Sequence, residues 1–219
     1  MANQTTNQEK REVTYFNRLV NHGIGNVILT QGDHEELIIE ADSEIRQRIR
    51  TEVRDETLYI NFDFGWQDLF GLNFIGRGPI RFLITMKDIQ ALRLSGAGNI
   101  EAKSIKTDKL ELSLSGAGNL RVDSLTSKEL NCMLSGAGNI TAGGSTETAQ
   151  IQLSGAGSFH GDSLEITDAK VIISGAGSAK MKVSKKLDGS ISGVGSVDYT
   201  GSPEVTSRVS GMGSIKKIG

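Results

Sequence analysis

The feature that most constrains this chain is a serine followed by Gly-x-Gly, which recurs seven times in the carboxyl-terminal part. The copies begin at Ser95, Ser115, Ser135, Ser154, Ser174, Ser192 and Ser210, with successive spacings of 20, 20, 19, 20, 18 and 18 residues. An earlier stretch, His22-Gly23-Ile24-Gly25-Asn26, fits the same frame without the serine. A period of this length is typical of a repeat protein, whose units bury their apolar faces against one another.

Apolar residues alternate with polar ones on both sides of each glycine turn. Before the turn they stand one, three and five positions ahead of the serine, as in Leu110, Leu112 and Leu114. After the turn, a large apolar residue usually follows the next polar position, as in Ile100 and Leu120. Alternation with a period of two indicates strand, turn and strand rather than helix.

Two arrangements could use such units: antiparallel hairpins, or a parallel β-solenoid with one coil for each 18–20 residues. The near-constant register favours the solenoid, because equivalent residues then stack as ladders from coil to coil. The position after the turn holds such a ladder in Asn99, Asn119 and Asn139, and serine in the later copies. We therefore predict an all-β, single-stranded parallel β-helix, and parallel crossovers favour right-handed coils.

The fourteen glycines of the seven turns require a physical reason, because glycine in an ordinary strand position lowers stability by about 0.5–1 kcal/mol relative to alanine. We expect them where φ is positive, or where stacked backbones approach too closely for a Cβ atom. These structural glycines are Gly96, Gly98, Gly116, Gly118, Gly136, Gly138, Gly155, Gly157, Gly175, Gly177, Gly193, Gly195, Gly211 and Gly213.

The chain divides into three parts. Residues 1–12 are polar and are expected to form a mobile tail. Residues 13–89 are expected to form irregular β coils that cap the solenoid, because an open end would expose an edge strand and the core. Within this part a helical turn at 43–50 is less favoured than strand, and strands are expected at 13–16, 25–30, 37–41, 49–53 and 58–62. Residues 90–219 are expected to form the regular solenoid, which ends in a shortened coil with charged residues suited to an exposed edge.

An aromatic segment at 62–82 interrupts the amino-terminal part and holds the only tryptophan. One interpretation is a hydrophobic plug that covers an end or a side of the solenoid. The other is an adhesive loop that binds a partner, a neighbouring protomer or a sugar ring, because aromatic anchors favour interfaces. In that second interpretation the candidate binding residues are Phe64, Trp66, Phe70 and Phe74.

Composition excludes several classes of protein. A formal net charge of −2 over 219 residues argues against a nucleic-acid binder. The single cysteine, Cys132, rules out an internal disulfide framework, and its place between Leu130 and Leu134 predicts a core residue. No apolar run approaches the length of a membrane-spanning helix. The three histidines are scattered, so we expect neither a metal site nor a cofactor.

Exposed columns beside the turns are where a β-helix enzyme would hold its chemistry. His160 and Asp162 share a face, and Asp123 lies two coils away, so an acid–base site acting on a polysaccharide is conceivable. The alternative is a solvated ladder of opposite charges, since Glu101 stacks beside Arg121. We favour the ladder and expect no catalytic residues.

The reiterated Ser-Gly-Ala-Gly-Asn-Ile/Leu at 95–100, 115–120 and 135–140 resembles the bacterial family known as putative auto-transporter adhesin, head GIN domain. The opening at 16–27 is similar to that family as well, and the resemblance covers about residues 13–219. It implies a β-helix related in shape to pectate-lyase-like proteins, with glycine turns joining two sheets. It also implies adhesion at the surface of Gram-negative bacteria and transfers no catalytic residue.

The resemblance also bears on partners and location. Its implied partners are a host or matrix glycan or protein, and self-association is open. Members of the family carry an export signal, whereas the polar start of this chain has no apolar segment, so we interpret the chain as a mature or trimmed extracytoplasmic form. The sequence thus predicts a non-enzymatic recognition scaffold. The alternatives are a carbohydrate-active, pectate-lyase-like enzyme and a purely structural envelope protein.

Overall fold

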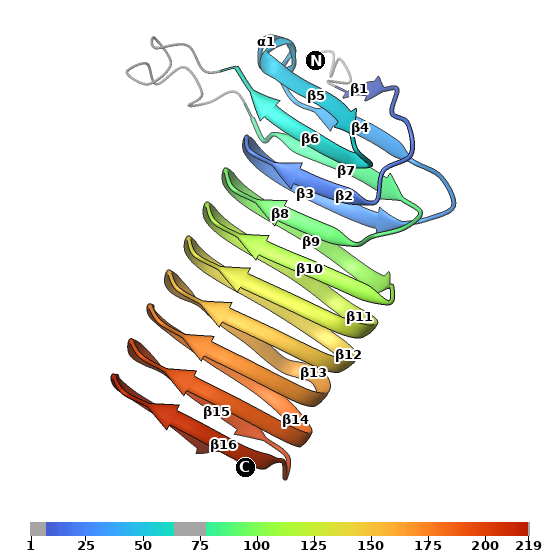
Figure 1. Cartoon of the computed structure of the whole chain (residues 1–219). Coiled ribbons are helices and arrows are strands. Elements are labelled where there is room, and N and C mark those ends of the chain that lie inside the picture. Colours follow the sequence, from blue (N-terminus) through green and yellow to red (C-terminus); the bar gives the residue numbers. More distant parts are fainter. Residues whose placement is uncertain (1–7, 64–77, 219) are drawn as a thin grey trace, which may run out of the picture.

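The repeats form coils that stack in parallel. The computed structural model describes residues 8–63 and 78–218. Each long strand follows most of one coil and pairs in parallel with the next, so that Gly118 lies opposite Gly138 and Leu134 opposite Leu153. These strands are β11 (Ala117–Leu134), β12 (Ala137–Leu153), β13 (Ala156–Ile173) and β14 (Ala176–Ile191). The predicted parallel β-solenoid is confirmed (Figure 1).

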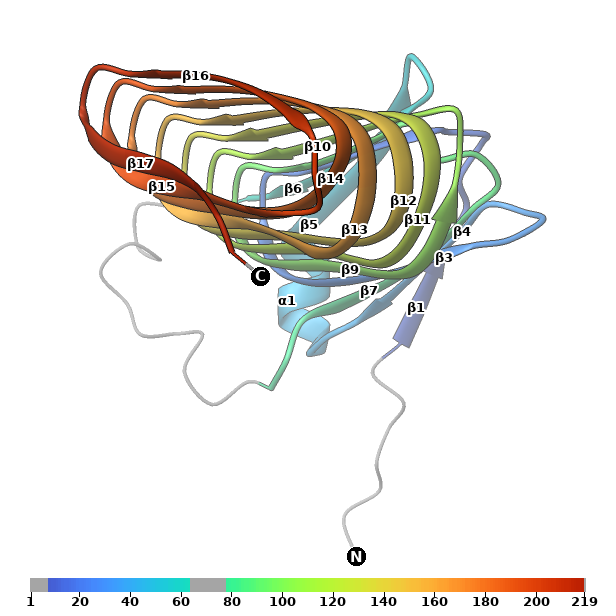
Figure 2. The ribbon, with the colours of Figure 1, turned by 90° about the horizontal axis from the view of Figure 1, so that it is seen from below.

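Shorter strands complete the coils on either side of these four. Viewed along the stack, the coils superpose as flattened rings whose two broad faces are joined by narrow edges (Figure 2). The strands that precede the long ones are β8 (Ala91–Leu94), β9 (Ala97–Lys106) and β10 (Lys109–Leu114). Those that follow are β15 (Val194–Thr200), β16 (Glu204–Val209) and β17 (Met212–Lys217).

Every second side chain points into the flattened ring and stacks on its equivalent in the next coil. Leu112, Cys132, Ile151 and Val171 form one such column, and all four are fully buried. Burying an aliphatic side chain of this size stabilises a fold by about 1.5–3 kcal/mol. The core is therefore a continuous apolar column along the axis. The polar residues that alternate with the apolar ones along each strand face solvent.

The amino-terminal coils are stacked in an order that differs from the order of the chain. One coil, made of β2 and β3, lies directly on β8 and β9, with Gly25 opposite Gly98. The next coil outward is made of β6 and β7, which follow β2 and β3 in sequence. The bounds are β2 (Arg18–Asn21), β3 (Ile24–Gln31), β6 (Thr57–Phe62) and β7 (Arg81–Met86). From β2 and β3 the chain thus builds outward to β6 and β7, and then passes back to continue the solenoid at β8.

Antiparallel strands and a short helix cover this end. Strand β4 (Glu36–Glu40) pairs antiparallel with β7, and β1 (Gln8–Arg11) pairs antiparallel with β4. Strand β5 (Ile49–Arg54) pairs antiparallel with β6, and helix α1 (Ser43–Arg48) precedes it. Four strand predictions are confirmed to within one residue at each end by β3, β4, β5 and β6.

Three local predictions were wrong. Residues 43–48 are helical, because the Asp42 side chain accepts a hydrogen bond from the Glu44 N–H at 2.9 Å and Ile45 is buried. No strand forms at 13–16, where Phe16 is instead buried in the core. Residues 8–11, expected in a mobile tail, form β1 along the exposed side of β4.

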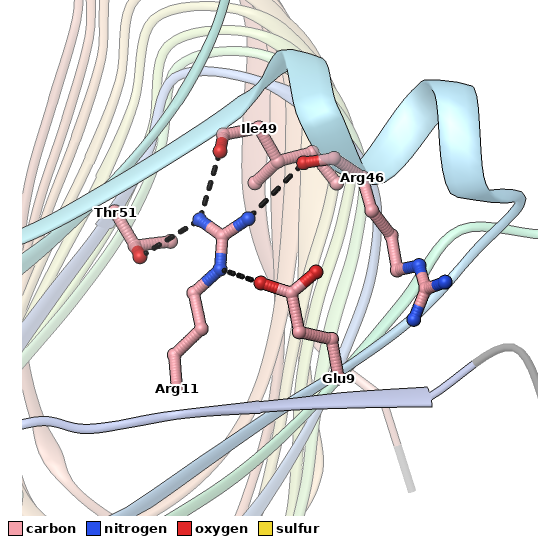
Figure 3. A network of polar contacts seen from close by, with 5 residues as sticks. All are labelled: Glu9, Arg11, Arg46, Ile49 and Thr51. Atoms are coloured by element: carbon pink, nitrogen blue, oxygen red, sulfur yellow. Dashed lines mark hydrogen bonds and ion pairs between the residues drawn. The ribbon is translucent and has the colours of Figure 1, made fainter.

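Arg11 holds β1 to the rest of the cap (Figure 3). Its guanidinium donates to the carbonyl oxygens of Ile49 at 2.8 Å and Arg46 at 3.1 Å, and to the Thr51 hydroxyl at 3.0 Å. Its Nε also donates to the Glu9 carboxylate at 2.9 Å. These contacts join β1 to α1 and β5, and hydrogen bonds from a charged donor are stronger than neutral ones.

Candidate functional site

The edge of the solenoid that carries the Gly-x-Gly turns, called the turn edge below, is built by close stacking of backbone. A Cβ atom added to Gly116 would overlap the carbonyl of Gly96, and one added to Gly118 would overlap that of Gly98. Gly118 also has a φ of +146°. In all fourteen turn glycines an added Cβ would come closer than 3.0 Å to backbone of the preceding coil. The turn edge therefore has no space for side chains at these positions.

Next to the turns, the asparagines form a hydrogen-bonded ladder. Asn119 Nδ2 donates to Asn99 Oδ1 at 2.9 Å, and Asn139 Nδ2 donates to Asn119 Oδ1 at 3.1 Å. The ladder extends one coil further, because Asn99 Nδ2 donates to Asn26 Oδ1 at 3.0 Å. Asn26 was not among the predicted ladder residues, although the outlying Gly-Ile-Gly-Asn copy carried the signal. Hydroxyls continue the same column, with Ser158 and Ser178 bonded at 2.9 Å.

The charged column beside the asparagines stacks in register, with Arg121 opposite Glu101. The carboxylate that Arg121 pairs with is, however, that of Asp123 on the same strand, at 2.6 Å. Farther from the turns, register shifts follow Val122 and Thr141. They remove the straight column on which an acid–base site at His160, Asp162 and Asp123 would depend. The structure therefore gives no support to the imagined catalytic arrangement.

Opposite the turn edge lies the far edge, which a trough follows across five neighbouring coils. The trough encloses about 580 Å³. Most of its lining side chains carry hydroxyls, with three charged groups and two aliphatic ones. The lining residues are Thr126, Ser127, Ser145, Thr146, Glu147, Glu165, Ile166, Thr167, Lys182, Val183, Ser184, Gly201 and Ser202. Four coil-to-coil spacings of about 4.8 Å give it a length of about 19 Å.

Coil length varies beside this trough. Between β13 and β14 the register passes from Gly161 opposite Met181 to Glu165 opposite Lys182, so three residues of β13 have no counterpart. The 18- to 20-residue spacing of the repeat is thus adjusted at the far edge. Coils of unequal length leave the far edge less regular than the turn edge.

Two internal interactions organise the trough. Lys182 Nζ donates to a Glu165 carboxylate oxygen at 2.8 Å, and this hydrogen bond lowers the pKa of Glu165. The Ser127 hydroxyl donates to the Thr146 hydroxyl at 2.9 Å, and Thr146 donates to the carbonyl of Thr148 at 3.1 Å. The buried hydroxyls are therefore satisfied within the protein. The exposed ones, such as Thr126 and Ser145, face the trough.

The other sequence-derived candidates lie elsewhere. Phe64, Trp66, Phe70 and Phe74 fall outside the described residues, so their interpretation as binding residues stays a prediction. Cys132 is fully buried in the core, and burial raises the pKa of its thiol. The only feature of the sequence that pointed to the trough was the unequal spacing of the repeats.

The described ranges, 8–63 and 78–218, hold no group of three or more His, Cys, Asp or Glu side chains able to bind a metal ion. They also hold no helix with the length and apolar character required to cross a bilayer.

Comparison with known proteins gives a family and a set of related folds. Residues 15–203 match the model of the family described as putative auto-transporter adhesin, head GIN domain. A search of curated proteins found no significant match.

Several solved structures are similar over nearly their full length. A putative adhesin from Bacteroides fragilis has a TM-score of 0.90 and 26% identity, covering 96% of each chain. A putative adhesin from Parabacteroides merdae has a TM-score of 0.72 and 20% identity, covering 99% of this chain and 98% of that one. A putative lipid binding protein from Parabacteroides distasonis has a TM-score of 0.75 and 20% identity, covering 98% of both. The last two show a shared fold alone.

Proposed function

Because the chain belongs to the family of putative auto-transporter adhesins with a head GIN domain, we propose that it is a non-enzymatic recognition scaffold of the cell surface or envelope. The putative adhesin from Bacteroides fragilis, similar over 96% of both chains, supports the same class of function. We place the binding site in the trough on the far edge. The observation behind this choice is that side chains from five coils line one concave surface there.

The chemistry of the trough suits an extended, uncharged glycan. Hydroxyl side chains both donate and accept hydrogen bonds, as sugar hydroxyls do. In each contact either hydroxyl can therefore be the donor and the other the acceptor. The two aliphatic residues of the lining, Ile166 and Val183, are buried in the core, so a ligand in the trough meets mainly hydroxyl and charged groups. The lining holds two carboxylates, Glu147 and Glu165, against the single ammonium of Lys182. That balance disfavours a polyanion.

The test is an array of glycans and matrix proteins probed with the full chain. The trough variant carries Thr126→Val, which keeps the side-chain shape and removes a hydroxyl, and Glu165→Gln, which keeps the side-chain size and removes the negative charge. Its matched control carries Thr141→Val and Glu101→Gln, the same changes on a broad face outside the trough. We expect the trough variant to bind its glycan at least about tenfold more weakly, a difference of about 1.4 kcal/mol, and the control to bind as wild type does.

The other outcomes each contradict part of the proposal. Binding that survives in the trough variant would exclude the trough and leave the adhesion role. Binding to no glycan or matrix protein would favour a purely structural envelope role. Cleavage of a polysaccharide in a parallel activity panel would favour an enzyme.

A further inference from the structure

Among the described residues, nothing covers the core at the carboxyl-terminal end of the solenoid. Val205 and Val209 of β16 stand in register with Leu187 and Ile191 of β14 and point in the same inward direction. Leu187 and Ile191 are 1% and 0% exposed, whereas Val205 and Val209 are 37% and 44% exposed. At the adjoining turn Met212 is 77% exposed. These residues form an apolar surface across the last coil.

The same end presents unpaired strand edges. Within the described chain β16 pairs only with β14, and β17 only with β15. Figure 1 shows β16 in the last coil of the stack. Ser210 N–H donates to the carbonyl of Ile191, toward the stack. Because backbone groups alternate in direction along a strand, those of Val205, Ser207 and Val209 point away from the stack. Such groups form a ready edge for another strand.

The opposite end is protected against the same association. Its outermost strands are β1, with the sequence Gln-Glu-Lys-Arg, and β5, which carries Arg50, Glu52 and Arg54. Charged side chains on an edge strand oppose pairing with a further strand. Stacking of one copy's last coil on another copy's cap, which would produce an open filament, is therefore disfavoured.

The sequence of β16 is complementary to itself in the antiparallel direction. If two copies of β16 pair about Thr206, then Glu204 of each copy lies opposite Arg208 of the other. Both positions face outward, since they align with the outward-facing Lys186 and Ser190. In the same register Val205 lies opposite Ser207 of the other copy, and their free backbone groups can exchange hydrogen bonds. Opposite charges placed across a strand pair stabilise it.

The lysines of β17 contact groups of their own chain, and of the two only Lys216 faces a carboxylate. Lys216 Nζ lies 3.8 Å from a carboxylate oxygen of Asp198, and Lys217 Nζ donates to the Ser202 hydroxyl at 3.4 Å. Both lysines thus interact with the last coils of their own chain.

From these contacts we propose that the open end binds a second copy of this chain, through antiparallel pairing of β16 with β16. The two solenoids then lie end to end about a two-fold axis, with their caps outermost and their uncovered cores in contact. A two-fold contact of this kind closes on itself and gives a dimer rather than a fibre. The dimer holds two troughs, so a repetitive glycan surface would be bound with avidity if the trough is the binding site.

The test measures the mass of the full chain by light scattering over a range of concentrations. Wild type is expected to be a dimer. Glu204→Arg alone and Arg208→Glu alone place like charges opposite one another, and each is expected to weaken dimerisation at least about tenfold. The double variant, Glu204→Arg with Arg208→Glu, restores opposite charges and is expected to dimerise as wild type does.

Each variant is compared with wild type by its thermal melt, because all the changed side chains are exposed and should leave the fold intact. A monomeric wild type at the highest soluble concentration would overturn the proposal. So would a dimer that is equally stable in both single variants, or a double variant that fails to recover. If one single variant does not fold, the mass of wild type and the dimerisation of the other single variant still test the proposal.

Discussion

The two edges of the solenoid differ in how regularly neighbouring coils are aligned. At the turn edge, seven copies of one motif stack with backbone against backbone, and an added Cβ on Gly116 or Gly118 would overlap the carbonyl of the preceding coil. At the far edge the register shifts by up to three residues between neighbouring coils, as between Gly161 and Glu165 of β13. One edge sets the spacing and alignment of the coils, and the other absorbs their differences in length.

This difference indicates where such a fold can change without unfolding. A side chain at the turn edge must fit between carbonyls of two coils, so substitutions there act on the whole stack. A residue at the far edge, such as Asp162 or Ser163, faces solvent and lacks a partner in the next coil. Unequal loops beside one another also create concave surface, so the edge where the coils differ in length is the edge that holds the trough.

The largest effect is expected from a side chain forced into the turn edge. Gly116→Val is expected to lower the free energy of unfolding by at least about 3 kcal/mol, because the neighbouring carbonyl cannot move without shifting a coil. Ser113→Val, three residues earlier on a broad face, is expected to change it by no more than about 0.5 kcal/mol. Denaturant unfolding measures both variants. Similar losses in the two would contradict the role assigned to the glycine.

The comparison of edges is sharpened by inserting the same two residues at each. Gly-Ser inserted between Asp162 and Ser163 lengthens a far-edge bulge that already exists, and should lower the free energy of unfolding by about 1 kcal/mol or less. Gly-Ser inserted between Gly155 and Ala156 of the same coil breaks the stacked turn and should cost at least about 3 kcal/mol. Thermal and denaturant unfolding of the pair decides between them. Equal tolerance would show that the two edges do not differ.

The regular coils could be predicted because one physical constraint repeats in them. Alternation at positions such as Leu110 and Leu112 reports which side chains are buried, and Gly-x-Gly reports where backbones touch. The cap lacks such repetition. Residues 43–48 became helical through one capping side chain, Asp42, and one buried side chain, Ile45. Single local contacts of this kind leave no periodic trace in a sequence.

The trough could not be predicted for a related reason. Its lining residues, such as Thr126 and Glu165, are ordinary polar positions of separate coils that become neighbours only through stacking. The order of the first coils was also hidden, since β2 and β3 precede β6 and β7 in sequence but lie inside them in the stack. Only the Gly-Ile-Gly-Asn copy at 23–26, which stacks on 96–99, pointed toward that arrangement.

A smaller effect is expected at the asparagine ladder. Asn119→Ala removes two side-chain hydrogen bonds, to Asn99 and Asn139, and should lower the free energy of unfolding by about 1 kcal/mol, because the ladder is exposed to water. Asn119→Ser should cost less, since Ser158 and Ser178 show that hydroxyls can bond in this column. A cost for serine equal to that for alanine would mean that the ladder contributes through packing alone.

The smallest effect is expected from the ion pair in the trough, and it depends on pH. The hydrogen bond from Lys182 lowers the pKa of Glu165 below the ordinary value of 4.5, so the pair contributes stability above that value. The contribution is lost as the pH falls through the lowered pKa. The melting temperature should therefore be slightly higher in wild type than in Glu165→Gln at neutral pH, and the two should converge well below pH 4.5. The control repeats Glu165→Gln in a Lys182→Gln background, where the resulting difference in melting temperature should not vary with pH. A pH-dependent difference that persists in this background would assign the effect to another neighbour of Glu165.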